Sequence, residues 1–271
     1  MVSECLVVPS RLRDSETPIS KLAKQSDSKM LNNYKYIRKL GEGYFAKVQL
    51  YQHTKSKKKV AVKKLTHQKL ASLRIGTSKF TAADCAKEEL RVLKELQHPN
   101  LVWLHEVIDD ACEADCGDIY LVTEYYPNGS LGDEIRRINK EKKGSLKLER
   151  PTLTIKGFST WQARLVFLDL LKALHYCHKV VGVVHRDIKP DNVMINKTGD
   201  AVLIDFGLVA NYSMKEDEDN EYANLKAGSY MFFAPELFSK ELYPFGPQTD
   251  IWALGITMYY VLTGHPPWRN C

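Results

Sequence analysis

A glycine-containing loop lies between two stretches with the pattern of β-strands, and this order limits the nucleotide folds open to the chain. LGEGYFAKV, residues 40–48, begins like the phosphate-binding pattern G-x-G-x-x-G but has Ala46 at the third glycine position. A dinucleotide-binding loop runs from a strand into a helix, whereas here VQLYQ follows, in which apolar and polar residues alternate. The sequence therefore argues against a Rossmann fold. It fits either an ordinary hairpin or one that covers phosphates, in which Gly41 and Gly43 let the backbone approach the nucleotide.

The composition is that of a folded chain with a sizeable core. Its 271 residues are 44% hydrophobic and 27% charged, which is enough for a core divided between two lobes. No apolar run reaches the length of a membrane span, and Pro9 interrupts the short apolar patch near the start, where a secretion signal needs a longer one. We therefore expect a protein of the cytoplasm or nucleus without a membrane partner.

The charged residues and the cysteines do not form a recognisable binding motif. The net charge of +6 is concentrated in the runs 55–59 and 136–150, which we interpret as solvated loops, and no aromatic residues alternate with their lysines and arginines. This pattern argues against a nucleic-acid partner. Cys112 and Cys116 lack two further ligands at zinc-binding spacing, so we expect the cysteines to be free thiols.

The order of strand and helix patterns predicts an α+β fold in two lobes. Residues 1–33 are rich in serine and charge without periodicity, and we interpret them as a flexible arm. Short runs rich in β-branched and aromatic residues dominate residues 34–123, together with an amphipathic helix over residues 81–96. Helical patterns dominate residues 129–271, so residues 124–128 are predicted to be the hinge.

Two short loops carry the residue types that phosphoryl transfer requires. Asp187, Lys189 and Asn192 lie in HRDIKPDN, and Asp205 lies in DFG, with β-rich runs beside both. The reaction needs a group that orients the attacking hydroxyl, oxygen ligands for magnesium, and a cation that balances the phosphoryl charge. Singly, each residue would more often cap a turn or remain solvated, but the ordered set favours a catalytic site.

With these motifs in this order, the chain resembles a eukaryotic protein kinase from about Tyr34 to Trp268. The glycine loop, VAVK, HRD, DFG and APE occur at compatible spacing. The resemblance implies a bilobal fold, with an antiparallel sheet and one helix in the N-lobe (34–123) and a mainly helical C-lobe (129–271). It also implies ATP and Mg²⁺ as cofactors and a protein substrate that offers serine or threonine hydroxyls.

The resemblance implies roles for residues of the two loops. Asp187 would be the catalytic base, and Lys189 would contact the γ-phosphate. Asn192 and Asp205 would ligate magnesium, while Asp250 would brace the catalytic loop from beneath.

A second group of residues is implied to bind the nucleotide. Lys63 of VAVK would hold the α- and β-phosphates and pair with Glu89, with Glu88 as the neighbouring candidate. The other implied residues are Leu40, Gly41, Glu42, Gly43, Ala46, Val48, Ala61, Thr123, Glu124, Tyr126 and Met194.

Smaller sequence differences bear on the kinase group. Lys189 and the stretch GSYMFFAPE, in which Ser229 would contact Asp187, resemble serine/threonine kinases. HPNLVWLHEVIDD and HRDIKPDNVMI are similar to the calcium/calmodulin-dependent protein kinase kinase group, although the insertion after Lys63 lacks that group's prolines. This likeness implies calmodulin or a scaffold as a partner through segments outside the chain.

Two departures from the family pattern leave alternatives open. The acidic run 216–222 either pairs with Arg186 and holds the activation loop, or is a solvated loop. The C-lobe is expected to continue past Cys271, so we interpret it as truncated. The alternative function is therefore a nucleotide-binding pseudoenzyme or interaction module that is inactive because the C-lobe is incomplete.

Overall fold

The computed structural model divides the chain into two compact units. It describes residues 17–22, 29–42, 46–66, 70, 81–110, 117–145, 158–212, 228–238 and 246–268. The first unit, called the sheet unit below, falls within Ser10–Gln97 and Val102–Tyr125. The second, called the helical unit, falls within His98–Leu101 and Tyr126–Cys271.

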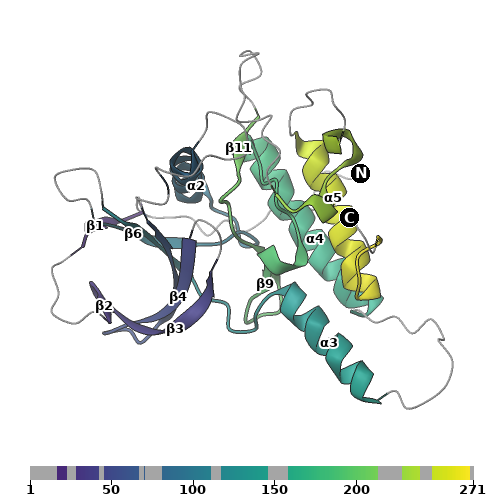
Figure 1. The fold of residues 1–271 in the computed structure, drawn as a ribbon, viewed down its shortest axis with the longest axis horizontal. Coiled ribbons are helices and arrows are strands. Elements are labelled where there is room, and N and C mark those ends of the chain that lie inside the picture. Colours follow the sequence, from purple (N-terminus) through teal and green to yellow (C-terminus); the bar gives the residue numbers. More distant parts are fainter. Residues whose placement is uncertain are drawn as a thin grey trace, which may run out of the picture. The chain divides into compact units, whose positions relative to one another are not determined.

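The sheet unit is built on a curled sheet whose described strands follow the order β1-β6-β7-β5-β4-β3-β2 (Figure 1). The strands are β1 (Ile19–Lys21), β2 (Met30–Leu31), β3 (Tyr34–Glu42), β4 (Ala46–His53), β5 (Lys59–Leu65), β6 (Leu104–Asp109) and β7 (Ile119–Glu124). Neighbouring strands are antiparallel, as predicted, apart from β1, which is parallel to β6. Val62, Ile108 and Val122 are fully buried on one face, because alternate side chains of a strand point the same way.

The two outermost strands lie within the segment that the sequence predicts to be a flexible arm, so that prediction does not hold at residues 19–21 and 30–31. Ser20 Oγ of β1 donates to Glu106 Oε1 over 2.6 Å, and Tyr34 OH donates to the other oxygen of this carboxylate over 2.8 Å. Asn32 Nδ2 donates to Ser20 Oγ and to the Lys21 carbonyl oxygen. Because β1 and β2 are the two edges of the sheet, these contacts show that the sheet curls until its edges meet.

Helix α2 (Ala82–Glu95) follows the predicted amphipathic pattern. Thr81 caps it, since its side chain accepts from the Asp84 amide while the Asp84 carboxylate accepts from the Thr81 amide. The hydrogen bonds from Thr81 lower the pKa of Asp84. Val92 and Leu93 are buried on the inner face, and Glu89 is buried with them.

The helical unit contains three α-helices among its described residues, with short strands and single helical turns between them (Figure 1). Its elements are α3 (Leu131–Ser145), α4 (Thr160–Tyr176), η1 (Cys177–Val181), β8 (Val183–Val184), η2 (Pro190–Asn192), β9 (Val193–Ile195), β10 (Ala201–Leu203), β11 (Ala210–Asn211), η3 (Tyr230–Phe232), η4 (Pro235–Phe238) and α5 (Pro247–Thr263). The antiparallel pairs β9–β10 and β8–β11 hold the loops that carry HRD and DFG. No helix in the described ranges is both long and apolar enough to span a membrane.

The basic run that begins at Arg136 is helical as far as Ser145, whereas the sequence predicts a solvated loop there. The reason is the spacing of its charges: Arg137 pairs with Glu134 three residues before it and with Glu141 four residues after it. Residues at these spacings are neighbours on one helix face, so opposite charges favour the helix. The rest of the run, 146–150, lies outside the described residues.

His98 connects the start of the helical unit to α4, and its environment predicts a pH dependence of stability. It is 5% exposed, its Nδ1 accepts from the Asn100 amide, and its ring packs against Tyr176. Burial, aided by the charge of Lys172, lowers the pKa of His98 from 6.5 to about 4. The contribution of neutral, buried His98 to the free energy of unfolding is therefore fully present above pH 6.5 and is lost as the pH falls through about 4.

The size of this effect can be measured by denaturant unfolding at several pH values. A shift of this size corresponds to up to about 3 kcal/mol of unfolding free energy. The control is His98→Asn, which offers an acceptor near Nδ1 but does not titrate in this range. We expect the wild type to lose more stability than the control between pH 6.5 and pH 4, and parallel curves would contradict the assignment.

Candidate active site

The loop that carries HRD is held by Asp250, the carboxylate on α5 that the family resemblance implies as a brace. Asp250 is 1% exposed and accepts hydrogen bonds from the amides of His185 and Arg186 over 2.8 and 2.9 Å. Its Oδ2 also lies 2.9 Å from Nε2 of His178. Arg186 has a φ of +68°, a conformation that costs energy for a residue with a side chain, and the two amide bonds hold the loop in it.

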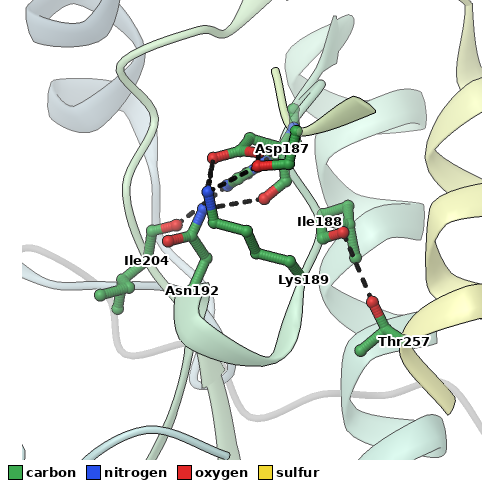
Figure 2. Close-up of polar contacts among 8 residues, drawn as sticks. Asp187, Ile188, Lys189, Asn192, Ile204 and Thr257 are labelled. Atoms are coloured by element: carbon green, nitrogen blue, oxygen red, sulfur yellow. Dashed lines mark hydrogen bonds and ion pairs between the residues drawn. The ribbon is translucent and has the colours of Figure 1, made fainter. Parts of the chain in front are cut away.

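Three side chains converge on the carboxylate of Asp187, and Figure 2 shows two of them, Lys189 and Asn192. Lys189 Nζ lies 2.6 Å from Oδ2, and Asn192 Nδ2 donates to the same oxygen and to the Asp187 carbonyl oxygen, each over 2.8 Å. Ser229 Oγ donates to Oδ1 over 2.9 Å and accepts from Lys189 over the same distance. Asp187 is 9% exposed, so the cluster fixes the direction of a nearly buried carboxylate.

Asn192 and Asp205, the two predicted magnesium ligands, lie on loops that are joined directly. The amide of Ile204 donates to the Asn192 carbonyl oxygen over 2.9 Å, which places the residue before Asp205 against Asn192. Asn192 uses Nδ2 for Asp187, and its side-chain oxygen is the atom suited to a cation. Asp205 is exposed and has a φ of +61°.

The donor set fits magnesium in one specific way. No group of three or more His, Cys, Asp or Glu side chains suited to a metal occurs among the residues that the structure describes. Magnesium does not need such a cage, because proteins commonly hold it through one or two side chains together with the phosphates of a substrate. One carboxylate and one amide oxygen on adjacent loops match that pattern.

A buried aromatic contact sets the backbone between these loops. The ring of His185 packs edge-on against Phe206 with 4.7 Å between centroids, and its Nε2 lies 3.0 Å from the Ile204 carbonyl oxygen. Both residues are fully buried. His185, the first residue of HRD, therefore has a polar contact with the residue before DFG and a ring contact with the phenylalanine of DFG.

In the sheet unit, the predicted ion pair between Lys63 and Glu89 is present. Lys63 Nζ on β5 lies 2.6 Å from Glu89 Oε1 on α2, and the Glu89 side chain is 4% exposed. Glu88, the other candidate, instead pairs with Arg91 on the helix surface. One helical residue turns the side chain by about 100°, which separates the buried position from the surface one.

The described residues of the glycine loop that are predicted to bind the nucleotide lie on two paired strands, β3 and β4. Gly41 on β3 pairs with Val48 on β4, and Ala46 starts β4. Glu42 forms ion pairs with Lys39 and Lys47, which lower the pKa of its carboxyl. Leu40 lies on β3 beside Gly41, whereas Gly43 lies outside the described residues.

The other predicted nucleotide residues are divided between the two units. Ala61 on β5 pairs with Thr123 on β7, whose Oγ1 donates to the Ala61 carbonyl oxygen over 3.3 Å, and Glu124 ends β7. Tyr126 is buried in the helical unit, where Met194 on β9 forms a bridge with Ser130.

Some features of the site were not predicted, and others cannot be examined. His178 was missed, since a histidine within an apolar helix gives no sign of a distant carboxylate partner. The ion pair between Arg136 and Asp191 was missed because its members are far apart in sequence. The acidic run 216–222, which one hypothesis pairs with Arg186, lies outside the described residues, so the structure does not test that pairing. The Cys112–Cys116 stretch lies outside them as well.

Comparisons with known proteins agree with this geometry. The sequence model of the protein kinase domain family matches residues 34–271 of this chain. CBL-interacting protein kinase 25 of Oryza sativa subsp. japonica is 35% identical over 237 residues, which cover 88% of this chain and 41% of that protein. The probable serine/threonine-protein kinase MARK-C of Dictyostelium discoideum is 35% identical over 89% of this chain and 27% of its own length.

A third relative, the SNF1-related protein kinase catalytic subunit alpha KIN12 of Arabidopsis thaliana, is 32% identical over 89% of this chain and 41% of its own length. The chain thus spans well under half the length of each of these relatives. Its folded units, the ordered HRD and DFG loops and the family match lead to one conclusion. The chain belongs to the protein kinase domain family, and its relatives there include serine/threonine kinases.

Proposed function

We propose that this chain transfers the γ-phosphoryl group of ATP to serine or threonine hydroxyls of a protein substrate, with Mg²⁺ as the metal. One observation carries the proposal: the hydroxyl of Ser229 donates to Oδ1 of Asp187 over 2.9 Å. The Asp187 carboxylate therefore has room beside it for a serine hydroxyl that donates to it, as the hydroxyl of a substrate would. Lys189, which contacts both groups, supplies positive charge at the same point.

The roles of the residues follow from their contacts. Asp187 accepts the proton of the attacking hydroxyl, and the hydrogen bonds from Asn192 and Lys189 hold its carboxylate in place. Lys189 is a cation near the transferring group, where developing negative charge needs compensation. Asn192 and Asp205 would hold magnesium, which neutralises phosphate charge when it is bound.

In the sheet unit, the buried Lys63–Glu89 pair would position a cation for the nucleotide phosphates. The Glu89 carboxylate is almost fully buried, so it fixes the ammonium group at one place. Gly41 and Ala46 would form the cover over the phosphates, because neither has a side chain large enough to obstruct close backbone approach.

The experiment that tests the proposal measures phosphoryl transfer directly. The purified chain is incubated with radiolabelled ATP, Mg²⁺ and a general protein substrate, and phosphoamino acids are then identified. We expect phosphoserine or phosphothreonine that depends on Mg²⁺. ATP binding without transfer, measured by calorimetry on the same sample, would overturn the proposal and support a nucleotide-binding pseudoenzyme.

Lys63→Met is expected to reduce transfer about 10²-fold, since it removes a fixed cation at the phosphates. It also removes the ammonium group that faces the buried Glu89 carboxylate, so thermal unfolding must be measured in parallel. The matched control is Lys63→Met with Glu89→Gln, which also removes the charge of the buried carboxylate. We expect the double variant to regain stability without regaining activity. Full activity of the single variant would contradict the phosphate role.

We also propose the finer placement in the calcium/calmodulin-dependent protein kinase kinase group. Its support is the likeness of HPNLVWLHEVIDD and HRDIKPDNVMI, while the relatives compared above carry the names of other groups. The group's name gives the test, since its members act on other protein kinases. We expect the chain to phosphorylate a kinase-inactive calmodulin-dependent kinase more readily than a general substrate, and equal rates would argue against the placement.

A further inference from the structure

A polar cluster fastens strand β1 to the rest of the sheet unit. Ser20 Oγ donates to Glu106 Oε1 over 2.6 Å and accepts from Asn32 Nδ2 over 3.2 Å. Tyr34 OH donates to the second oxygen of the same carboxylate over 2.8 Å. Burial and the neighbouring Glu106 carboxylate raise the pKa of Tyr34, so its hydroxyl keeps the proton that it donates. The Ser20 hydroxyl therefore lies directly against a carboxylate whose other oxygen is already in use.

Strand β1 is short and lies at the edge of the sheet. The Val107 amide donates to the Pro18 carbonyl oxygen over 3.0 Å, and the Leu22 amide donates to that of Asp109 over 2.9 Å. None of the three residues of β1 is buried, and Ile19 is 61% exposed. Edge segments with little buried apolar surface open at a low cost in free energy. We therefore expect β1 to detach and reattach while the rest of the sheet stays folded.

A phosphate on Ser20 would be incompatible with the attached strand. It would carry about 1.5 to 2 negative charges beside the Glu106 carboxylate, where like charges repel. The 2.6 Å between the Ser20 and Glu106 oxygens also leaves no room for a phosphorus atom and three further oxygens. Lys21 does not offset the charge, because successive side chains of a strand point to opposite faces. Phosphorylation of the detached strand would thus prevent its return.

We propose that Ser20 is a phosphorylation site and that its phosphate holds β1 away from β6. When β1 is detached, a serine kinase acting in trans transfers the γ-phosphoryl group of ATP to Ser20 Oγ. The bond from the phosphorus to ADP breaks as the bond to Ser20 Oγ forms, and the hydroxyl proton passes to the base of that kinase. A hydroxyl at position 20 thus favours the closed sheet, and a phosphate ester favours the open one.

The strand register connects β1 to the proposed nucleotide site within the same unit. Ile19 pairs with Val107 of β6, which pairs with Leu121 of β7. Leu121 in turn pairs with Lys63 of β5. Detachment of β1 removes the backbone bonds on the outer side of β6 in this row, so the sheet should hold Lys63 less firmly. The effect on phosphoryl transfer rests on the proposed function, whereas the detachment of β1 does not.

Hydrogen–deuterium exchange of the full chain tests the detachment. Exchange at the Val107 amide is compared for the wild type, a chain with phosphoserine incorporated at position 20, Ser20→Asp and Ser20→Asn. The Asp and Asn side chains match in size and differ in charge, and Asn can still donate to Glu106. We expect exchange at Val107 to be about tenfold faster with phosphoserine or Asp than with Asn, because only a negative charge is repelled by the carboxylate.

Glu106→Gln identifies the repelling group. Combined with Ser20→Asp, it removes the carboxylate charge but keeps an acceptor for Tyr34, so exchange at Val107 should return to within about twofold of the wild type. Equal exchange in the Asp and Asn variants, or no return in the double variant, would overturn the inference. Mass spectrometry of the chain isolated from its own cells should find phosphate on Ser20, and its absence there would overturn the site.

An assay with radiolabelled ATP measures the effect on phosphoryl transfer. We expect Ser20→Asp and the phosphoserine chain to transfer phosphate about tenfold more slowly than Ser20→Asn, since a displaced Lys63 positions the phosphates less well. Circular dichroism checks that each variant folds. Equal transfer rates despite faster exchange would overturn the link to Lys63. Absence of transfer in every chain would count against the proposed function alone, because the exchange results would still decide whether β1 detaches.

Discussion

Asp187→Asn is expected to reduce phosphoryl transfer by about 10²–10⁴-fold while ATP binding is retained. The amide keeps the shape of the carboxylate but cannot take up the proton of the attacking hydroxyl. It also carries no charge to pair with Lys189, whose Nζ lies 2.6 Å from Oδ2. Transfer is measured with radiolabelled ATP, and nucleotide binding is measured by calorimetry.

The matched control for this variant is Ser229→Ala. It removes the hydroxyl that donates to Oδ1 of Asp187 but leaves the carboxylate and its contacts with Lys189 and Asn192 intact. We expect a smaller loss of transfer than in Asp187→Asn, because the substrate hydroxyl can replace the one that is removed. Retained turnover in Asp187→Asn would refute the assignment of the base.

Asp250→Ala is expected to destabilise the helical unit by about 3–5 kcal/mol, the range found when one partner of a buried charged network is removed. The change leaves the amides of His185 and Arg186 buried without their acceptor, and His178 loses its contact with the carboxylate. Since these amides hold the unfavourable φ of Arg186, the catalytic loop should lose its conformation as well.

Chemical unfolding followed by circular dichroism measures the loss of stability. Asp250→Asn is the matched variant, since it keeps one acceptor oxygen, and we expect it to be destabilised less than Asp250→Ala. Thr257→Val on the same helix removes only a weak hydrogen bond to the Ile188 carbonyl oxygen, over 3.4 Å, and serves as a background control (Figure 2). Similar stability in all three variants would contradict the role of Asp250.

The sequence predicts those parts of the molecule whose determinants are local. Helix α2 carries an amphipathic pattern over its whole length, and its cap lies within four residues. The family resemblance implies Glu89 rather than Glu88 as the partner of Lys63, and the structure contains that ion pair, with Glu88 paired to Arg91 instead. The HRD and DFG loops could be located because their residue types occur in order between strand patterns.

Other parts depend on contacts between residues that are distant in the chain, and these could not be predicted. Strand β1 has three residues, too few for a periodic pattern, and hydrogen bonds to Glu106 and Asn32 help to hold it. The Arg136–Asp191 pair joins positions that only the folded chain brings together. The basic run that begins at Arg136 was predicted to be a loop, but ion pairs of Arg137 with Glu134 and Glu141 favour the helix α3.

The meeting of the two sheet edges has a practical consequence for work with this kinase domain. The family match begins at residue 34, and a recombinant fragment cut at that boundary would lack both β1 and β2. The backbone groups of β6 that now bond to Pro18 and Leu22 would face solvent, and an unpaired strand edge invites association between copies. Fragments for crystallisation or inhibitor screening should therefore retain the chain from before residue 17.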